Sequence, residues 1–313
     1  TNENTGIVMI DSNDNEWVWV EVPATVFTTA TNNTDYDNIK ADLISYASDY
    51  REGKKGQGCN WTDEWYAMDG NTLVTASTEG LTDAQKALNN GCGLTYAEYT
   101  TKYRTMLSSI YTNKGFYIGR YEAGIAGSDT NTSLARYSRT EITSSSPKAV
   151  SMKNMIPYNF ITRDDAQILA QRMNYDGCIS SLIFGVQWDL MLKYIETKAV
   201  KENKILTTDS ITIGNYYNGS FEINRGKFAQ YGLYLKWYDY SSNERTDLIE
   251  NCKKKAQTRG SNGTLLTTGA LDMTKLQNIY DIAGNVWEWT LEFCTVEHPC
   301  VRRGGSYVSK GKE

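Results

Sequence analysis

Alternating hydrophobic and polar residues predict short strands at three places in the first half of the chain. Residues 7–10 and 16–23 lie on either side of a polar turn, and together they predict an N-terminal hairpin. Residues 116–122 predict a third strand with the same period. These segments are short, so they predict small sheets rather than one large sheet.

The clearest strand pattern comes near the end of the chain, in residues 286–290, after a tight Ala-Gly-Asn turn. Glu288 is expected to face one way, whereas Trp287 and Trp289 face the other. Because this alternation is typical of a core strand, we expect both indole rings to be buried. The alternative is that the two rings are exposed and stack on a sugar.

Apolar residues recur at helical spacing in five segments. Thr95 and Glu98 form a capping box at the start of the longest one. Thr162 opens another helix, in which four apolar residues share one face: Ala166, Leu169, Ala170 and Met173. The five predicted helices span 35–50, 81–90, 95–113, 162–173 and 186–197.

The segments between these elements are long and polar. Residues 51–80 and 128–151 show no sustained period, and residues 200–275 are mostly turns rich in Asn, Gly and Tyr. So much irregular chain is a poor match to a doubly wound fold. We therefore predict a single α+β domain over residues 1–313, with short strands, two core helices and long loops.

The charge of the chain excludes some partners. The net charge is −5, with 32 Lys and Arg against 37 Asp and Glu, whereas nucleic acids and anionic membranes attract proteins through a basic field. No apolar run is long enough to span a membrane. The 22 Tyr and 8 Trp suit a wet binding face, because their rings combine apolar area with a polar group.

Histidine and cysteine limit the possible catalytic chemistry. The only histidine, His298, lies in a hydrophilic turn, so a multi-His iron site cannot form and we expect His298 to be solvated. None of the six Cys forms a CxxC pair. We predict a Cys294–Cys300 disulfide, because the two residues flank a turn; the alternative is six free thiols.

Several segments resemble the formylglycine-generating enzyme (sulfatase-modifying factor) family, which has a C-type-lectin-like fold. The strongest are Gly284-Asn-Val-Trp-Glu-Trp289 and Arg303-Gly-Gly-Ser-Tyr307. Weaker ones occur in family order at residues 16–23, 115–124, 156–167, 181–190 and 214–216. The resemblance implies a helical insertion at about residues 31–112 and a closing strand that would follow Glu313.

The resemblance also implies two sites. Asp281, Gly284, Val286 and Glu288 match a structural calcium site of the family, and oxygen ligands at this spacing suit that hard cation. The alternative is that the two acids cap the turn through hydrogen bonds. The family's substrate groove implies a ligand face with these residues: Tyr216, Tyr217, Arg302, Arg303, Ser306, Tyr307 and Ser309. For the two arginines, the alternative is salt bridging at the end of a strand.

The catalytic chemistry of the family is not expected here. Catalytic members carry a copper-binding Cys two residues after the Gly-Gly-Ser-Tyr string, where this chain has Ser309, and a Ser oxygen is a poor ligand for copper. We therefore expect no copper and no enzyme activity. The alternatives are a copper-dependent oxidase of peptide Cys and a pilin-like subunit that displays the domain.

The pattern is also similar to surface proteins of Gram-positive gut bacteria and to lectin-like proteins diversified by retroelements. This similarity implies a secreted or cell-surface bacterial protein with a possible membrane anchor before Thr1. It would bind a protein or glycan through loops near its C-terminal strand. The sequence thus predicts a non-catalytic ligand-binding module.

Overall fold

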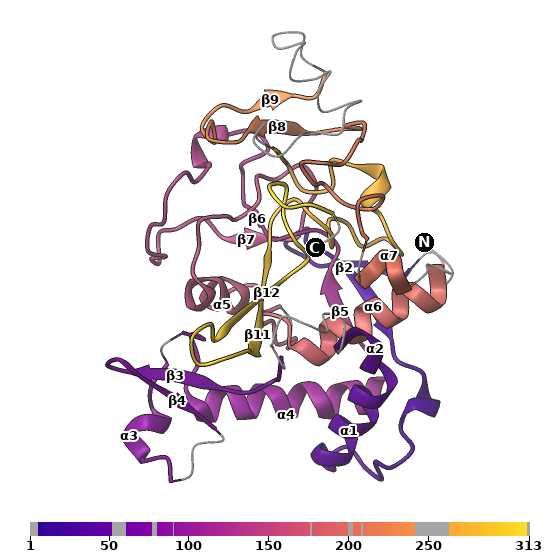
Figure 1. Ribbon diagram of the computed structural model, residues 1–313, viewed down its shortest axis with the longest axis vertical. Helices are drawn as coiled ribbons and strands as arrows, with labels where there is room; N and C mark the ends of the chain where they lie inside the picture. Colours follow the sequence, from indigo (N-terminus) through magenta and orange to yellow (C-terminus); the bar gives the residue numbers. More distant parts are fainter. Residues whose placement is uncertain are drawn as a thin grey trace.

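A computed structural model describes residues 6–51, 61–76, 80–89, 91–175, 177–199, 203–207, 209–241 and 263–311. Within these ranges the protein is a mixed α+β structure with several small antiparallel sheets and seven α-helices (Figure 1). The predicted α+β class, short strands and long loops are confirmed.

The N-terminal half contributes three of the sheets. The predicted hairpin forms and continues into a three-stranded sheet in the order β1-β2-β5, in which Val18 and Val20 are fully buried. Residues 51–80, expected to be loop, contain the β3–β4 hairpin. The strands are β1 (Val8–Ile10), β2 (Glu16–Glu21), β3 (Tyr66–Asp69), β4 (Thr72–Thr75), β5 (Gly115–Gly119), β6 (Gly124–Ile125) and β7 (Ala149–Val150), the last two forming their own pair.

The C-terminal half contributes a second three-stranded sheet and a hairpin. The sheet has the order β10-β8-β9, and β11 pairs with β12. The strands are β8 (Lys227–Gln230), β9 (Tyr238–Asp239), β10 (Thr264–Leu266), β11 (Glu288–Phe293) and β12 (Cys300–Arg303). The predicted strand after the Ala-Gly-Asn turn is thus β11.

Two of the helices begin at the predicted caps. Thr95 and Glu98 form the capping box that starts α4, and the Thr162 side chain accepts a hydrogen bond from the Asp165 amide at the start of α5. The helices are α1 (Tyr36–Tyr46), α2 (Ser48–Arg51), α3 (Asp83–Lys86), α4 (Tyr96–Asn113), α5 (Arg163–Gln171), α6 (Gly185–Ala199) and α7 (Asn203–Thr207). Three short 3-10 turns are Ala24–Val26, Thr132–Leu134 and Asp272–Thr274.

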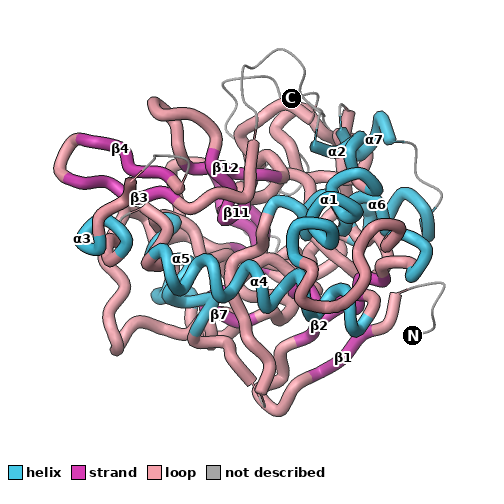
Figure 2. The backbone as a smooth tube through the Cα atoms, turned by 90° about the horizontal axis from the view of Figure 1, so that it is seen from below, coloured by secondary structure: helices cyan, strands magenta, loops and turns pink. Residues whose placement is uncertain are grey.

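The largest core cluster joins the predicted insertion at 31–112 to the remainder of the chain. Ile39 of α1 and Leu107 of α4 are buried in the same cluster as Val20 of β2 and Met191 of α6. In Figure 1, α1, α4 and the β3–β4 hairpin lie at the lower end, β8 and β9 lie at the opposite end, and α5 and β11–β12 lie between them. In the view from below, α4 lies between α5 and α1 (Figure 2).

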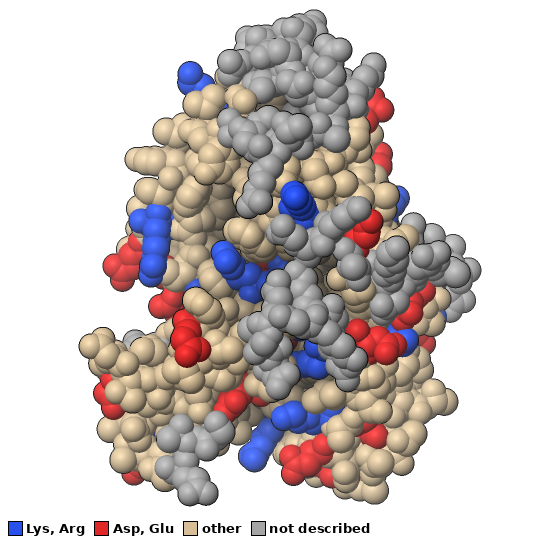
Figure 3. All heavy atoms as spheres, viewed as in Figure 1, with Lys and Arg blue, Asp and Glu red and all other residues tan. Residues whose placement is uncertain are grey.

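Charged side chains are interspersed on the face drawn in Figure 3, where blue and red atoms alternate rather than gathering into one basic patch. Among the described helices, none is both long and apolar enough to cross a bilayer.

The cysteine prediction is wrong in both of its forms. Cys294 is disulfide-bonded, whereas Cys300 is a free thiol, so the two do not form a bridge. The Cys300 Sγ instead contacts the Tyr66 hydroxyl at 2.5 Å. Cys92 and Cys178 are also free, and Cys59 and Cys252 lie outside the described residues. His298 is exposed in its turn, as predicted.

Candidate functional site

The turn before β11 adopts a conformation that depends on glycine. Gly284 has φ +77°, and a Cβ at this position would lie 2.1 Å from the Asn215 carbonyl oxygen. The close approach lets the Asn285 amide donate to the Asn215 carbonyl oxygen at 2.9 Å. The turn is therefore fixed against the loop around residue 215.

Asn285 connects this turn to four other parts of the chain. Its side-chain oxygen accepts hydrogen bonds from the Leu266 amide and the Asn215 side chain, both at 3.0 Å. Its side-chain nitrogen donates to Glu122 at 2.6 Å. Its carbonyl oxygen accepts the Tyr307 amide at 2.9 Å. Because Asn285 is buried, these bonds hold the turn rigidly in place.

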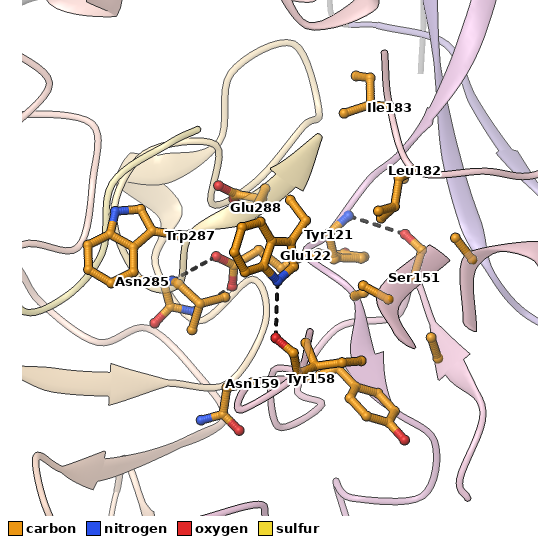
Figure 4. Close-up of a pocket in the computed structure, with 18 of the residues that line it drawn as sticks. Tyr121, Glu122, Ser151, Tyr158, Asn159, Leu182, Ile183, Asn285, Trp287 and Glu288 are labelled. Carbon is orange, nitrogen blue, oxygen red and sulfur yellow. Dashed lines mark hydrogen bonds between the residues drawn. The ribbon is translucent and has the colours of Figure 1, made fainter. Parts of the chain in front are cut away.

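Beside this turn lies a cavity of about 570 Å³, a size typical of small-molecule sites. Residues from β5, α5, the segment before α6 and the turn into β11 line it, and most of them are aromatic or aliphatic. Figure 4 shows Asn285 and Trp287 on one side of the cavity and Leu182 and Ile183 on the other. Aromatic lining residues are Trp17, Tyr121, Tyr158, Phe160, Trp188, Tyr231, Tyr234, Tyr280, Trp287, Trp289 and Tyr307.

One wall of the cavity is the predicted apolar face of α5. Ala166, Leu169 and Ala170 of α5 line it, together with Met173 just after the end of the helix, at the spacing i, i+3, i+4 and i+7. Two of the four are alanines, whose short side chains leave room between α5 and β11. The face was predicted correctly, but it borders the cavity instead of only filling the core.

A pair of carboxyl groups forms part of another wall. Glu122 accepts hydrogen bonds from the Asn285 side chain and from the Val286 amide at 3.0 Å, and Glu288 is the other carboxyl of the pair. Burial raises the pKa of Glu122 well above its usual range, and the nearby Asp281 carboxylate adds to this. Burial likewise raises the pKa of Glu288, with Glu122 as the next cause. Both shifts disfavour the charged forms, so burial opposes ionisation of the two carboxyls together.

The mouth of the cavity carries an arginine stacked on two indoles. The Arg302 guanidinium lies 4.2 Å from the ring centre of Trp287 and 5.6 Å from that of Trp289. Trp287 is 40% exposed, so the expectation that both rings are buried is wrong for Trp287. Trp289 is half-buried, and its indole N–H donates to the Ile161 carbonyl at 3.1 Å.

Arg303 has a different role from Arg302. It is buried, and it makes two hydrogen bonds to Glu292, from Nη2 at 2.6 Å and from Nε at 2.9 Å. It also lies 3.5 Å from Asp189. Arg51 of α2 reaches the same carboxylates. For Arg303, the salt-bridge alternative is therefore the one that the structure supports.

The other expected ligand residues are divided between the cavity and its support. Ser306 and Tyr307 line the cavity together with Arg302. Tyr216 is buried, and its hydroxyl contacts Ser210 at 2.6 Å and donates to the Gly304 carbonyl at 3.0 Å. Tyr217 is also buried and is bound through its amide to the Ser309 carbonyl. Tyr216, Tyr217, Arg303 and Ser309 thus support the site and do not line it.

The expected calcium ligands are close in sequence, but their side chains already have different partners. Both carboxylate oxygens of Asp281 accept hydrogen bonds, from the Gly269 amide at 2.6 Å and from the Thr274 hydroxyl at 2.9 Å. This is the hydrogen-bonded alternative. Glu288 Oε2 is buried and accepts no hydrogen bond from a described donor, so it suits a hard cation better. Among the described residues, no group of three or more His, Cys, Asp or Glu is arranged to hold a metal ion.

Sequence reasoning did not identify Glu122 or the alanines of α5 as site residues. Glu122 lies in the segment 115–124 that carries part of the family resemblance, but it meets Val286 across 164 positions of the chain. The alanines were visible as an i, i+4 pair on the predicted face. Whether these alanines leave an open space depends on the residues of the opposite wall. Hydrophobic periodicity within one segment carries no information about those residues.

Comparisons with protein-family models, curated proteins and solved structures found no match to this chain. The resemblance to the formylglycine-generating family therefore stays a prediction that rests on the motifs alone.

Proposed function

We propose that this chain is a non-catalytic ligand-binding protein that takes part of a protein or glycan ligand into the aromatic-lined cavity. The observation that carries the proposal is the cavity itself. It brings Arg302, Ser306 and Tyr307, three of the residues expected at a ligand face, next to exposed Trp287. Aromatic walls with few polar groups are the usual composition of a binding pocket.

The fold that we propose is the C-type-lectin-like fold of the formylglycine-generating type. Its support is the order of the motifs, together with small antiparallel sheets and long connecting segments in the described chain. In this scheme the loops carry the binding surface, and the paired strands and helices hold it in place.

Display outside the cell is the location that we propose, either secreted or on a bacterial surface. The disulfide bond of Cys294 supports it, because disulfides persist in oxidising compartments. A structural calcium ion at Asp281, Gly284, Val286 and Glu288 is part of the same proposal. Its support is the buried Glu288 oxygen without a donor.

The test is a screen of peptide and glycan arrays with two variants of the protein. Ala170→Phe places a ring in the cavity from α5 and should abolish binding of the hits. Ala84→Phe puts the same ring on the exposed surface of α3 and should leave binding unchanged. Hits that bind Ala170→Phe as well as the wild type would refute the cavity as the binding site.

A further inference from the structure

The cavity has an apolar interior and a cationic mouth. The interior is bounded by the α5 face and by Leu182 and Ile183, so it can accept a ring or an aliphatic chain. The small side chains of Ala166 and Ala170 leave space for such a group beside α5. A sugar ring, by contrast, would need many polar partners, and this wall provides few of them.

Arg302 is the available positive charge at the mouth. It is exposed, and none of the ion pairs found among the described residues involves it. Its neighbour Arg303 pairs with two buried carboxylates. Stacking on Trp287 and Trp289 fixes the plane of the Arg302 guanidinium while its N–H edge stays free to bind a planar anion.

The hairpin register separates Arg302 from the acidic wall. Arg302 lies opposite Trp289, whereas Glu288 lies opposite Arg303. Because side chains alternate along a strand, Arg302 shares a face with the two indoles and Glu288 points to the other face. An anion on Arg302 would therefore approach from the indole side, away from Glu288.

We propose that this cavity binds the C-terminal residue of a peptide. That residue has an apolar or aromatic side chain and a backbone carboxylate. This inference rests on the proposed function and narrows its ligand from a protein or glycan to a peptide. The ring or aliphatic group enters beside α5, and the carboxylate receives two parallel hydrogen bonds from Arg302. Ser306 is a buried lining residue whose hydroxyl contacts that of Ser309 at 3.2 Å, so it is a polar group of the cavity wall.

The probes are N-acetylphenylalanine and N-acetylphenylalaninamide, which differ only in the carboxylate. Isothermal titration of the full chain should give a dissociation constant about tenfold lower for the acid, as expected for a charge-assisted pair at a partly solvated site. Arg302→Gln should abolish this preference, so that the acid and the amide bind with equal dissociation constants. Arg139→Gln removes an exposed arginine outside the cavity and should keep the preference.

Each of the other results would contradict a specific part of the proposal: the carboxylate, the peptide ligand or the cavity. Equal affinity for acid and amide, or a preference that survives Arg302→Gln, would overturn the carboxylate assignment. Failure of both probes to bind, with array hits that still lose binding in Ala170→Phe, would overturn the peptide ligand and keep the cavity. Competition by a neutral oligosaccharide alone would indicate a glycan. If Ala170→Phe does not weaken binding of the probes, the cavity is not the binding site, and the proposed function is refuted as well.

Discussion

Adjacent arginines in β12 should respond to substitution in opposite ways. Arg303→Met removes both short hydrogen bonds from Glu292, whose side chain is 0% exposed. Arg51 at 3.5 Å is then the nearest cation to that carboxylate. Breaking a buried ion pair by removing one partner costs about 3–5 kcal/mol. Arg302→Met removes an exposed guanidinium and its stacking on two indoles, so its effect on the free energy of unfolding should stay within about 1 kcal/mol.

The assay is urea unfolding followed by tryptophan fluorescence, with the slope of the transition compared among variants. The double variant Arg303→Met/Glu292→Met should be more stable than Arg303→Met alone, because it leaves no unpaired Glu292 charge in the core. Equal destabilisation by Arg302→Met and Arg303→Met would refute the different roles given to these neighbours. A double variant as unstable as the sum of the two single variants would refute the ion-pair explanation.

Three further predictions concern the same region. If calcium binds at Glu288, a chelator should lower the melting temperature of the wild type but not of Glu288→Gln; an unchanged melting temperature in both would contradict the site. Burial raises the pKa of Asp189 to about 7 despite Arg303 and Arg51, so its contribution to stability is full below about pH 4 and is lost as the pH rises through 7. Unfolding free energies at pH 5 and pH 8 should differ less in Asp189→Asn, and an equal difference would contradict this. Cys300→Ser should leave the disulfide of Cys294 intact in peptide mapping without reduction. Loss of that disulfide in the variant would instead support a Cys294–Cys300 bridge.

Local signals along the chain predicted the elements well. The caps at Thr95 and Thr162 were visible because a cap depends on residues three positions apart, and the α5 face was visible because helical spacing is a local property. The hairpin β3–β4 was missed because Tyr66–Asp69 and Thr72–Thr75 are too short to show a period. The stability of a short strand depends on the strand that it pairs with, and the composition of the segment does not identify that partner.

The site was less predictable, because its chemistry depends on residues that are distant in sequence. Arg302 and Arg303 look equivalent in the sequence, and only the buried acids Glu292 and Asp189 distinguish them. Glu122 becomes a site residue only where Val286 and Glu288 fold back onto it. The Cys294–Cys300 prediction failed for a related reason, because closeness in sequence says little about which thiols meet.

The position of a bound ligand decides whether this cavity is the binding site. A crystal structure of the protein with N-acetylphenylalanine, or with the strongest array hit, would show where the ligand lies. We expect electron density between the α5 face and the β11–β12 hairpin, with a carboxylate against Arg302. Density on another face, with this cavity unchanged, would contradict it.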